Sequence, residues 1–177
     1  MSGWIILFAG PICSGKSTLS KALAQKLGWK WVSFADYLRH VATDQRLPAS
    51  RSSLQDLGQQ LIDKSWLAFC QSVLQFAHWT PDLSLIVDGV RHVEAVVTLQ
   101  SLTAPTPIVV VFVETPLQTR KERFAAREPK GSFEIADSHP VERDAGTRLR
   151  LLANHVVDGA APVADTVDQL VRMMPLD

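Results

Sequence analysis

Short runs of consecutive apolar residues recur along the chain and predict the strands of a sheet. Trp4–Ala9 is apolar throughout and is followed by a glycine, which is typical of a strand buried on both faces. Ser84–Asp88 and Pro107–Val113 have the same character, and His155–Val157 is a weaker example. Together with Lys30–Phe34, these runs predict a sheet of five strands.

The stretches between these runs carry apolar residues three and four positions apart, which predicts amphipathic helices. Leu19, Leu23 and Leu27 form such a stripe, and Gly28 follows it as a helix terminator. Strands that alternate with helices pair in parallel, so we predict a three-layer α/β fold with helices on both faces of the sheet. The expected helices are Lys16–Leu27, Asp36–Ala42, one long helix that opens at Pro48 and runs to Ala77, a helix after Pro116 and a C-terminal helix.

A polar stretch from Glu128 to Gly146 interrupts this pattern. It is too rich in charge for a core element and too long for an ordinary connection between elements. We therefore predict that residues 128–146 form a mobile lid.

Composition narrows the class of protein further. The chain has 177 residues, 46% of them hydrophobic, which favours one domain over 1–177. Its 18 basic and 18 acidic residues cancel, so neither nucleic acid nor a membrane is an expected partner. Two cysteines without a C-x-x-C pair argue against a disulfide framework or a zinc site. The apolar run at 4–9 is too short to span a bilayer and lacks the basic flank of a signal peptide, so we expect a cytoplasmic protein. The oligomeric state stays open.

The segment between the first strand and the first helix, GPICSGKS, fits the phosphate-binding pattern G-x-x-x-x-G-K-S. Glycines let successive backbone N–H groups face phosphate oxygens, and the next helix adds its positive N-terminal end. Lys16 is expected to contact the β- and γ-phosphates of ATP, and the Ser17 hydroxyl to bind Mg²⁺. The expected donor site comprises Gly10, Cys13, Ser14, Gly15, Lys16, Ser17 and Thr18.

Cys13 lies inside this motif, and two interpretations of its thiol stay open. A thiol beside Lys16 and a helix N-terminus lies in positive potential, which favours an exposed, reactive thiolate. A thiol turned into the core is inert and only fills space. Both fit the motif, because the positions between its glycines tolerate many side chains.

Further anion-binding side chains follow other predicted strands. Arg39 comes after the second strand, three residues beyond Asp36, and Arg91 comes three residues after Asp88. Ligands of open α/β sheets bind at the carboxyl ends of the strands, where these side chains would meet. They therefore predict a second anionic ligand beside the nucleotide.

A basic helix face adds to this set. Arg120, Arg123 and Arg127 are three and four positions apart, so they share one face of the helix after Pro116. Their like charges repel one another, and a bound anion would turn that repulsion into attraction. Arg51, near the start of the long helix, is a further candidate.

Five segments together resemble the nucleoside monophosphate kinases: GPICSGKST, SFADYLRH, IVDGVR, ERFAAR and HVVDG, in this order. The similarity is closest to the short branch that contains deoxynucleoside monophosphate kinases and dephospho-coenzyme-A-kinase-like proteins. It implies a P-loop NTPase fold with a five-stranded parallel sheet and a small lid. It also implies ATP as the phosphoryl donor and Mg²⁺ as the metal.

The resemblance implies roles for the arginines as well. Arg39 and Arg91 would hold the acceptor's phosphate, whereas Arg123 and Arg127 would bind the donor nucleotide and the transferred phosphoryl group. The adenine would lie near Arg123 and the loop 156–162. Residues 36–78 would form the acceptor-binding arm. Among the lid residues, Arg143 is the best candidate for a contact with phosphate.

Two aspartates each keep two possible roles. Asp88 would bind Mg²⁺ through a water molecule, or it would cap the end of its strand. Asp36 would orient or deprotonate an acceptor hydroxyl, as in dephospho-coenzyme-A kinases, or it would cap the helix that follows. A phosphate acceptor is already ionised and needs no base, so the cap role fits a nucleotide acceptor.

We therefore expect transfer of the γ-phosphoryl group of Mg-ATP to a small phosphorylated acceptor, a nucleoside or deoxynucleoside monophosphate. Two alternatives stay open. The first is a small-molecule kinase with a hydroxyl acceptor such as dephospho-coenzyme A, which would need Asp36 as a base. The second is an ATP-binding switch without an acceptor, which would have no use for Arg39 and Arg91.

Overall fold

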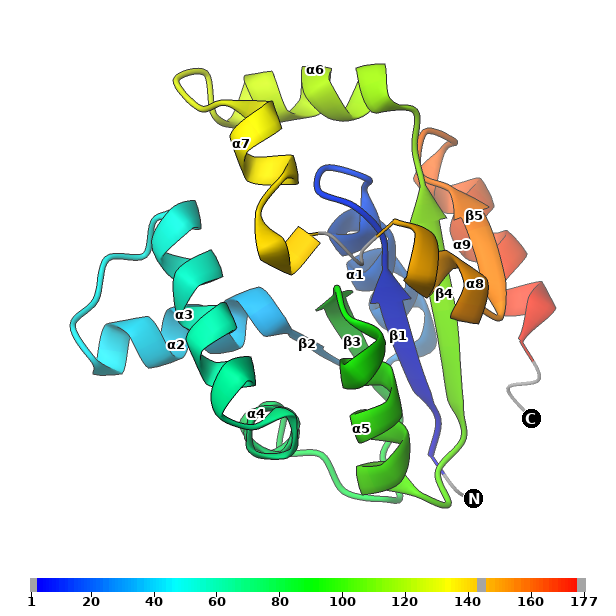
Figure 1. Ribbon diagram of the computed structural model, residues 1–177. Coiled ribbons are helices and arrows are strands. Elements are labelled where there is room, and N and C mark those ends of the chain that lie inside the picture. The colour runs from blue at the N-terminus through cyan, green and yellow to red at the C-terminus, as the bar shows by residue number, and fades with distance from the viewer. Residues whose placement is uncertain (1–2, 143–145, 175–177) are drawn as a thin grey trace.

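The computed structural model describes residues 3–142 and 146–174, and a parallel β-sheet forms its centre (Figure 1). Within these residues the strands are β1 (Ile5–Ala9), β2 (Lys30–Ser33), β3 (Leu85–Val90), β4 (Ile108–Glu114) and β5 (His155–Asp158). They lie in the order β2-β3-β1-β4-β5, and each neighbouring pair is parallel. The predicted α/β fold with five parallel strands is confirmed.

Helices cover both faces of this sheet. They are α1 (Lys16–Leu27), α2 (Phe34–Asp44), α3 (Arg51–Lys64), α4 (Trp66–Phe76), α5 (Val93–Thr103), α6 (Leu117–Arg127), α7 (Phe133–Asp137), the 3₁₀ helix η1 (Pro140–Glu142), α8 (Thr147–Leu152) and α9 (Val163–Met173). Helices α1 and α9 lie on one face, and α4, α5 and α8 lie on the other (Figure 1). No helix within the described ranges is long and apolar enough to cross a bilayer.

The central strand β1 shows how one apolar run supplies two cores. Ile5 and Leu7 pack with residues of α4 and α5, whereas Ile6 and Phe8 pack with residues of α1 and α9. Successive side chains of a strand point to opposite faces, so all four are fully buried. The strand ends at Ala9, and the phosphate-binding motif begins at the next residue.

One expected helix is two helices in the structure. The segment 48–77 contains α3 and α4, which are separated at Ser65. Ser65 has an extended backbone, and its Oγ accepts a hydrogen bond from the Ala68 N–H at 3.1 Å. The spacing of apolar residues continues across this break, so it does not show where α3 ends. The only sequence signal for the break is Ser65 itself, since serine is favoured at helix N-caps. The break lets α3 pack on α2 while α4 packs on the sheet.

Helix α5 is an element that the apolar pattern did not predict. Its residues Ala95, Val96 and Leu99 are buried in the same core as Ile5 and Leu7. A helix between the third and fourth predicted strands could have been expected from their parallel pairing. Parallel strands cannot be joined by a tight turn and need a crossover connection, which is usually a helix.

The segment 128–146 differs from the polar stretch that its composition predicts. Over residues 128–142 it contains α7 and η1. Phe133 and Ala136 of α7 are buried against Ile12 and Phe124, and α7 lies beside the loop that follows β1 (Figure 1). The sequence pattern did not predict this helix, because it buries only a few apolar side chains and the rest of the stretch is charged or polar. The described part is therefore an ordered, packed element, and its movement as a lid stays a prediction.

Candidate active site

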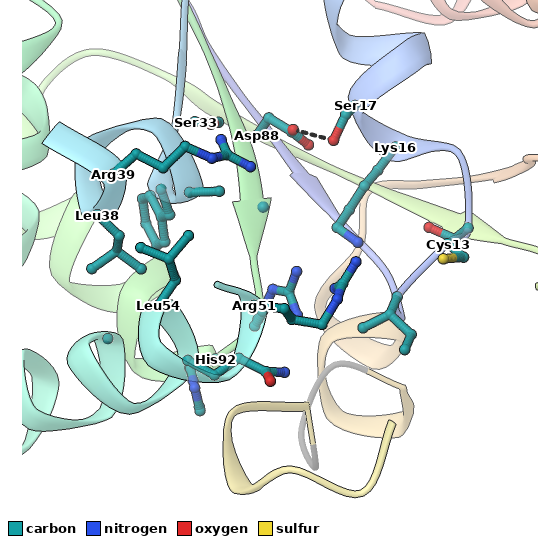
Figure 2. Close-up of a pocket in the computed structure, with 18 of the residues that line it drawn as sticks. Cys13, Lys16, Ser17, Ser33, Leu38, Arg39, Arg51, Leu54, Asp88 and His92 are labelled. Atoms are coloured by element: carbon teal, nitrogen blue, oxygen red, sulfur yellow. Dashed lines mark hydrogen bonds between the residues drawn. The ribbon is translucent and has the colours of Figure 1, made fainter. Parts of the chain in front are cut away.

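A cavity of about 420 Å³ lies at the carboxyl ends of the strands. Its walls come from the phosphate-binding loop, the residues at the end of β3, and helices α2, α3 and α4. Arg127 and Glu128, at the end of α6, complete the wall. Figure 2 shows Lys16 and Arg51 directed into this space from different elements. The structure thus brings the predicted donor and acceptor elements to one place.

The loop between β1 and α1 requires glycine at both of its ends. Gly10 has a φ of 142°, and a Cβ there would lie 2.6 Å from the carbonyl oxygen of Val113. Gly15 has a φ of 96°, a conformation that residues with side chains rarely adopt. Gly15 is also the N-cap of α1, and no described side chain caps this helix. The first N–H groups of α1 therefore remain available to an anion.

Lys16 is buried among other cations. Its side chain is 6% exposed, and Nζ donates a hydrogen bond to the Pro11 carbonyl oxygen at 2.9 Å. Burial, and next the charge of Arg91, lower the pKa of Lys16 to about 7. Burial also lowers the pKa of Arg91 to about 10. A bound polyphosphate would stabilise both charged forms, so this environment fits ATP.

Asp88 and Ser17 form a candidate Mg²⁺ site. The Ser17 hydroxyl donates a hydrogen bond to Asp88 Oδ2 at 2.5 Å (Figure 2). Burial raises the pKa of Asp88, although the nearby Lys16 opposes this shift. Oδ1 is buried and has no hydrogen-bond partner in the described part of the chain. This arrangement fits Mg²⁺, which takes one or two protein ligands and completes its shell with phosphate and water.

No group of three or more His, Cys, Asp or Glu side chains suited to a metal occurs within 3–142 and 146–174.

Two residues that support the loop from behind were not predicted. Gly159 follows β5, and a Cβ there would collide with the carbonyl oxygen of Ser14 and the hydroxyl of Thr115. The Thr115 hydroxyl donates to the same Ser14 carbonyl at 2.7 Å. Arg123 donates to the Gly159 carbonyl at 2.8 Å, so it lies beside the loop 156–162, as expected. Gly159 belongs to the HVVDG segment, but the sequence did not indicate its role, because Ser14, which it contacts, lies near the other end of the chain.

Cys13 lies on the inner side of this loop. Its side chain is 7% exposed and packs with Ile12, Phe124, Phe133 and Ala136. Its low exposure and apolar neighbours agree with the core thiol. Cys13 also lines the cavity, so its reactivity toward a reagent stays a prediction.

Four arginines line the part of the cavity that is predicted to hold the acceptor: Arg39 from α2, Arg51 from α3, Arg91 after β3 and Arg127 at the end of α6. They come from four separate elements, so no short motif could group them. Arg39 is the most accessible of the three that form ion pairs there, with a side chain 55% exposed against 31% for Arg51 and 22% for Arg91. Position favours Arg91 and Arg51 as the buried anion contacts.

Asp36 does not take the helix-cap role. Ser33 is the N-cap of α2, and its Oγ accepts a hydrogen bond from the Asp36 N–H at 2.9 Å. The helix begins at Phe34, two residues earlier than the pattern predicts, because Ser33 is itself an N-cap residue type. The Asp36 carboxylate pairs with Arg39 and does not line the cavity. The base role therefore has no support from the geometry.

Apolar and aromatic side chains form the far wall of the cavity. The ring centroids of Trp66 and His92 are 5.1 Å apart, and Phe34 and Phe69 make an edge contact at the same distance. Leu38 and Leu54 complete this wall (Figure 2). Such a surface suits a flat, weakly polar group attached to an anion.

Arg143 and the two residues after it lie outside the described residues. Its predicted contact with phosphate therefore stays a prediction. Its neighbour Glu142 is described, and its carboxylate forms an ion pair with Arg91.

Comparisons with known proteins agree with this geometry. The family model described as an AAA domain matches residues 6–142. A cytidylate kinase from Natronomonas pharaonis is 26% identical over 159 residues, which cover 87% of this chain and 73% of that protein. A cytidylate kinase from Bdellovibrio bacteriovorus is 48% identical over 40 residues, so this match spans only 23% of this chain and 18% of the relative's length.

Among solved structures, a gluconokinase from Sinorhizobium meliloti 1021 has a TM-score of 0.61 and 17% identity, covering 97% of this chain and 90% of that chain. At this identity the likeness concerns the fold alone. The predicted fold and the predicted resemblance to P-loop kinases are confirmed.

Proposed function

Because this chain belongs to the AAA domain family, whose model matches residues 6–142, we propose that it is an ATP-dependent phosphotransferase acting on a nucleoside monophosphate. The observation that carries this proposal is the charge of the cavity. Lys16, Arg39, Arg51, Arg91 and Arg127 line it, against the carboxylates of Asp88 and Glu128. Such an excess of cations suits two phosphorylated ligands bound together.

The carboxylates of the cavity support a phosphate acceptor over a hydroxyl acceptor. A hydroxyl must lose its proton during transfer, so it needs a nearby base. Asp88 accepts a hydrogen bond from Ser17 and is the candidate Mg²⁺ ligand, and Glu128 pairs with Arg51. Asp36 lies outside the cavity lining. A phosphate is already ionised, so it needs none of these groups as a base.

The apolar wall and the named relatives narrow the choice of acceptor. Trp66 and Phe69 offer ring faces and edges to a flat base, and Arg91 lies where the attached phosphate would bind. The relatives' name, cytidylate kinase, makes cytidine monophosphate and its deoxy form the first acceptors to test.

The residues would act by position and charge. Lys16 and the N–H groups of α1 hold the donor's phosphates, Arg91 and Arg51 hold the acceptor's phosphate, and Arg127 lies between them at the end of α6. Ser17 and Asp88 would hold Mg²⁺, which neutralises the charge of the phosphate oxygens when bound. With both substrates bound, the arm 36–78 and the lid 128–146, within one domain, would enclose the transfer and exclude water.

A substrate panel tests this proposal. Purified protein with Mg-ATP should release ADP at a rate that depends on an added nucleoside monophosphate, and dephospho-coenzyme A should have no effect. Mass spectrometry of the products identifies the phosphorylated acceptor. Stimulation by dephospho-coenzyme A alone would establish the hydroxyl-acceptor alternative, and release of ADP unaffected by every acceptor would favour the switch.

A further inference from the structure

Two of the arginines that line the cavity, Arg91 and Arg51, are paired with carboxylates of one segment of the chain. Arg91 forms an ion pair with Glu142 of η1, whose side chain is fully buried. Arg51 forms an ion pair with Glu128 at 2.5 Å, and both of these side chains are about one-third exposed. Both carboxylates come from the segment 128–142, which we call the strap.

Further contacts tie the strap to the acceptor-binding arm. His139 of the strap lies 3.4 Å from the Asp56 carboxylate of α3, and Gln55 of α3 donates to the Ala136 carbonyl at 3.5 Å. At its other side, Phe133 packs with Ile12 of the phosphate-binding loop. The strap therefore connects the two halves of the site through its own side chains.

We propose that Glu142 occupies the place of the acceptor's phosphate on Arg91 in the free protein, so that the arriving acceptor must displace it and thereby release the strap. This inference rests on the proposed function, since it takes Arg91 as the acceptor's anchor. Glu142 would then compete with the acceptor's phosphate for Arg91.

Electrostatics explains why Glu142 and a phosphate exclude one another. Arg91 has one positive charge in a largely buried position, and its burial together with the charge of Arg51 already disfavours the charged form. The Glu142 carboxylate, which pairs with Arg91, compensates this charge. A phosphate at the same guanidinium would bring its own negative charge against a buried carboxylate, which repels it across a medium of low dielectric.

Displacement of Glu142 has a consequence for the rest of the strap. Glu142 is fully buried, and a buried carboxylate that loses the positive charge of Arg91 is not stable there, so it moves toward water. Only His139 and Ser138 separate η1 from α7, so movement of Glu142 pulls on the helix that carries Phe133. Arrival of the acceptor is thereby transmitted to the phosphate-binding loop at Ile12.

Hydrogen–deuterium exchange of the strap tests the proposal without any need for catalysis. The probe is inorganic phosphate, and the variant is Glu142→Gln, which keeps the shape and removes the charge. In the free wild-type protein, phosphate should raise the exchange rates of amides 133–142 by about tenfold, and Glu142→Gln should raise them similarly without phosphate. Unchanged exchange in both cases would overturn the proposal.

Glu134→Gln is the matched control. Glu134 also lies in the strap, but its side chain is 69% exposed and pairs with Lys121 on α6, outside the cavity. This variant should exchange like the wild type. Glu142→Asp is the second variant in case Glu142→Gln does not fold: it keeps the charge but shortens the reach, so exchange should rise to an intermediate level.

Kinetics then separates this proposal from the proposed function. If a nucleoside monophosphate is the acceptor, Glu142→Gln should lower its KM by about three- to tenfold, with the KM for ATP unchanged. A raised acceptor KM would mean that Glu142 holds Arg91 in its working position, and the competitor proposal would be wrong. If no acceptor is phosphorylated by the wild type, the proposed function fails, and the exchange experiment alone decides the role of Glu142.

Discussion

The proposed donor side and the proposed acceptor side of the cavity are built in opposite ways. The donor side is one continuous stretch, Gly10 to Thr18, at the junction of β1 and α1. The acceptor side takes Arg39, Arg51 and Arg91 from separate elements. A site made of consecutive residues can be recognised in the sequence as a motif. A site made of distant residues contributes single arginines, and nothing near each of them in the sequence indicates its role.

The two sides also differ in how their cations are compensated. Lys16 donates to a backbone carbonyl, and its pKa falls to about 7. Arg51 and Arg91 are instead each paired with a carboxylate of the strap. The proposed donor side therefore has no carboxylate on its lysine to displace, whereas our proposal requires an acceptor to displace the carboxylate on Arg91.

The largest expected effect concerns the donor side. Lys16→Ala removes the cation that contacts the transferred phosphates, so kcat should fall by about a thousandfold or more. Lys26→Ala, on the same helix but paired with Asp168 at the surface, is the control and should retain full activity. Circular dichroism and steady-state kinetics check both. Near-normal turnover of Lys16→Ala would mean that the donor does not bind in this loop.

Gly159→Ala tests whether the donor side is as local as its motif suggests. The new Cβ would collide with the Ser14 carbonyl and displace the phosphate-binding loop, so kcat/KM for ATP should fall by about a hundredfold. Gly146→Ala is the control, because a Cβ there meets nothing within 4 Å. If both variants keep wild-type kinetics, the loop does not depend on its support from β5.

Arg91→Ala tests the acceptor side. A charge-assisted contact is worth about 1.5–3 kcal/mol, so the acceptor KM should rise roughly 10- to 100-fold while the affinity for ATP changes little. Arg39→Ala should have a smaller effect, since Arg39 is more than half exposed and paired with Asp36. Loss of ATP binding in Arg91→Ala, with an unchanged acceptor KM, would reverse the assignment of the two sides.

The smallest effect is a pH dependence of ATP binding. With a pKa of about 7, Lys16 in the free protein loses its proton as the pH rises through neutrality. Bound phosphates favour the charged form and raise that pKa, so binding above pH 7 takes up a proton. The affinity for ATP should therefore fall as the pH rises from 7 to 9.

Calorimetry in buffers of different ionisation enthalpy measures this proton uptake directly. Lys16→Met binds ATP more weakly but has no group to protonate at this position, so its affinity should vary less between pH 7 and pH 9. Equal pH dependence in both proteins would assign the proton to another group.

The same shift affects stability with a definite sign. The pKa of Lys16 is lower in the folded than in the unfolded chain, so the unfolded chain binds more protons between pH 7 and about pH 10. The free energy of unfolding that depends on Lys16 therefore rises over this range, and burial of the charged form is most costly below pH 7. Lys16→Met should stabilise the ligand-free protein most at pH 6, and the difference should shrink above pH 9.

The sequence by itself determined the sheet and the donor loop. The apolar run of β1 fills two cores at once, so its burial on both faces follows from the run itself. Gly10 and Gly15 adopt backbone conformations that glycine allows and other residues rarely adopt. The sequence also contained helix starts that the apolar pattern alone did not predict. Ser33 and Ser65 are of a residue type favoured at helix N-caps, and they mark the start of α2 and of α4.

The tertiary structure alone decided which charges meet. Glu142 and Arg91 are separated by α5, β4, α6 and α7, so their pairing depends on how these elements fold over the sheet. In the same way, packing on Ile12 turned a charged stretch into the helix α7, and packing put Cys13 in the core. Apolar periodicity records burial along one element, whereas an ion pair between elements depends on their relative position, which no local pattern encodes.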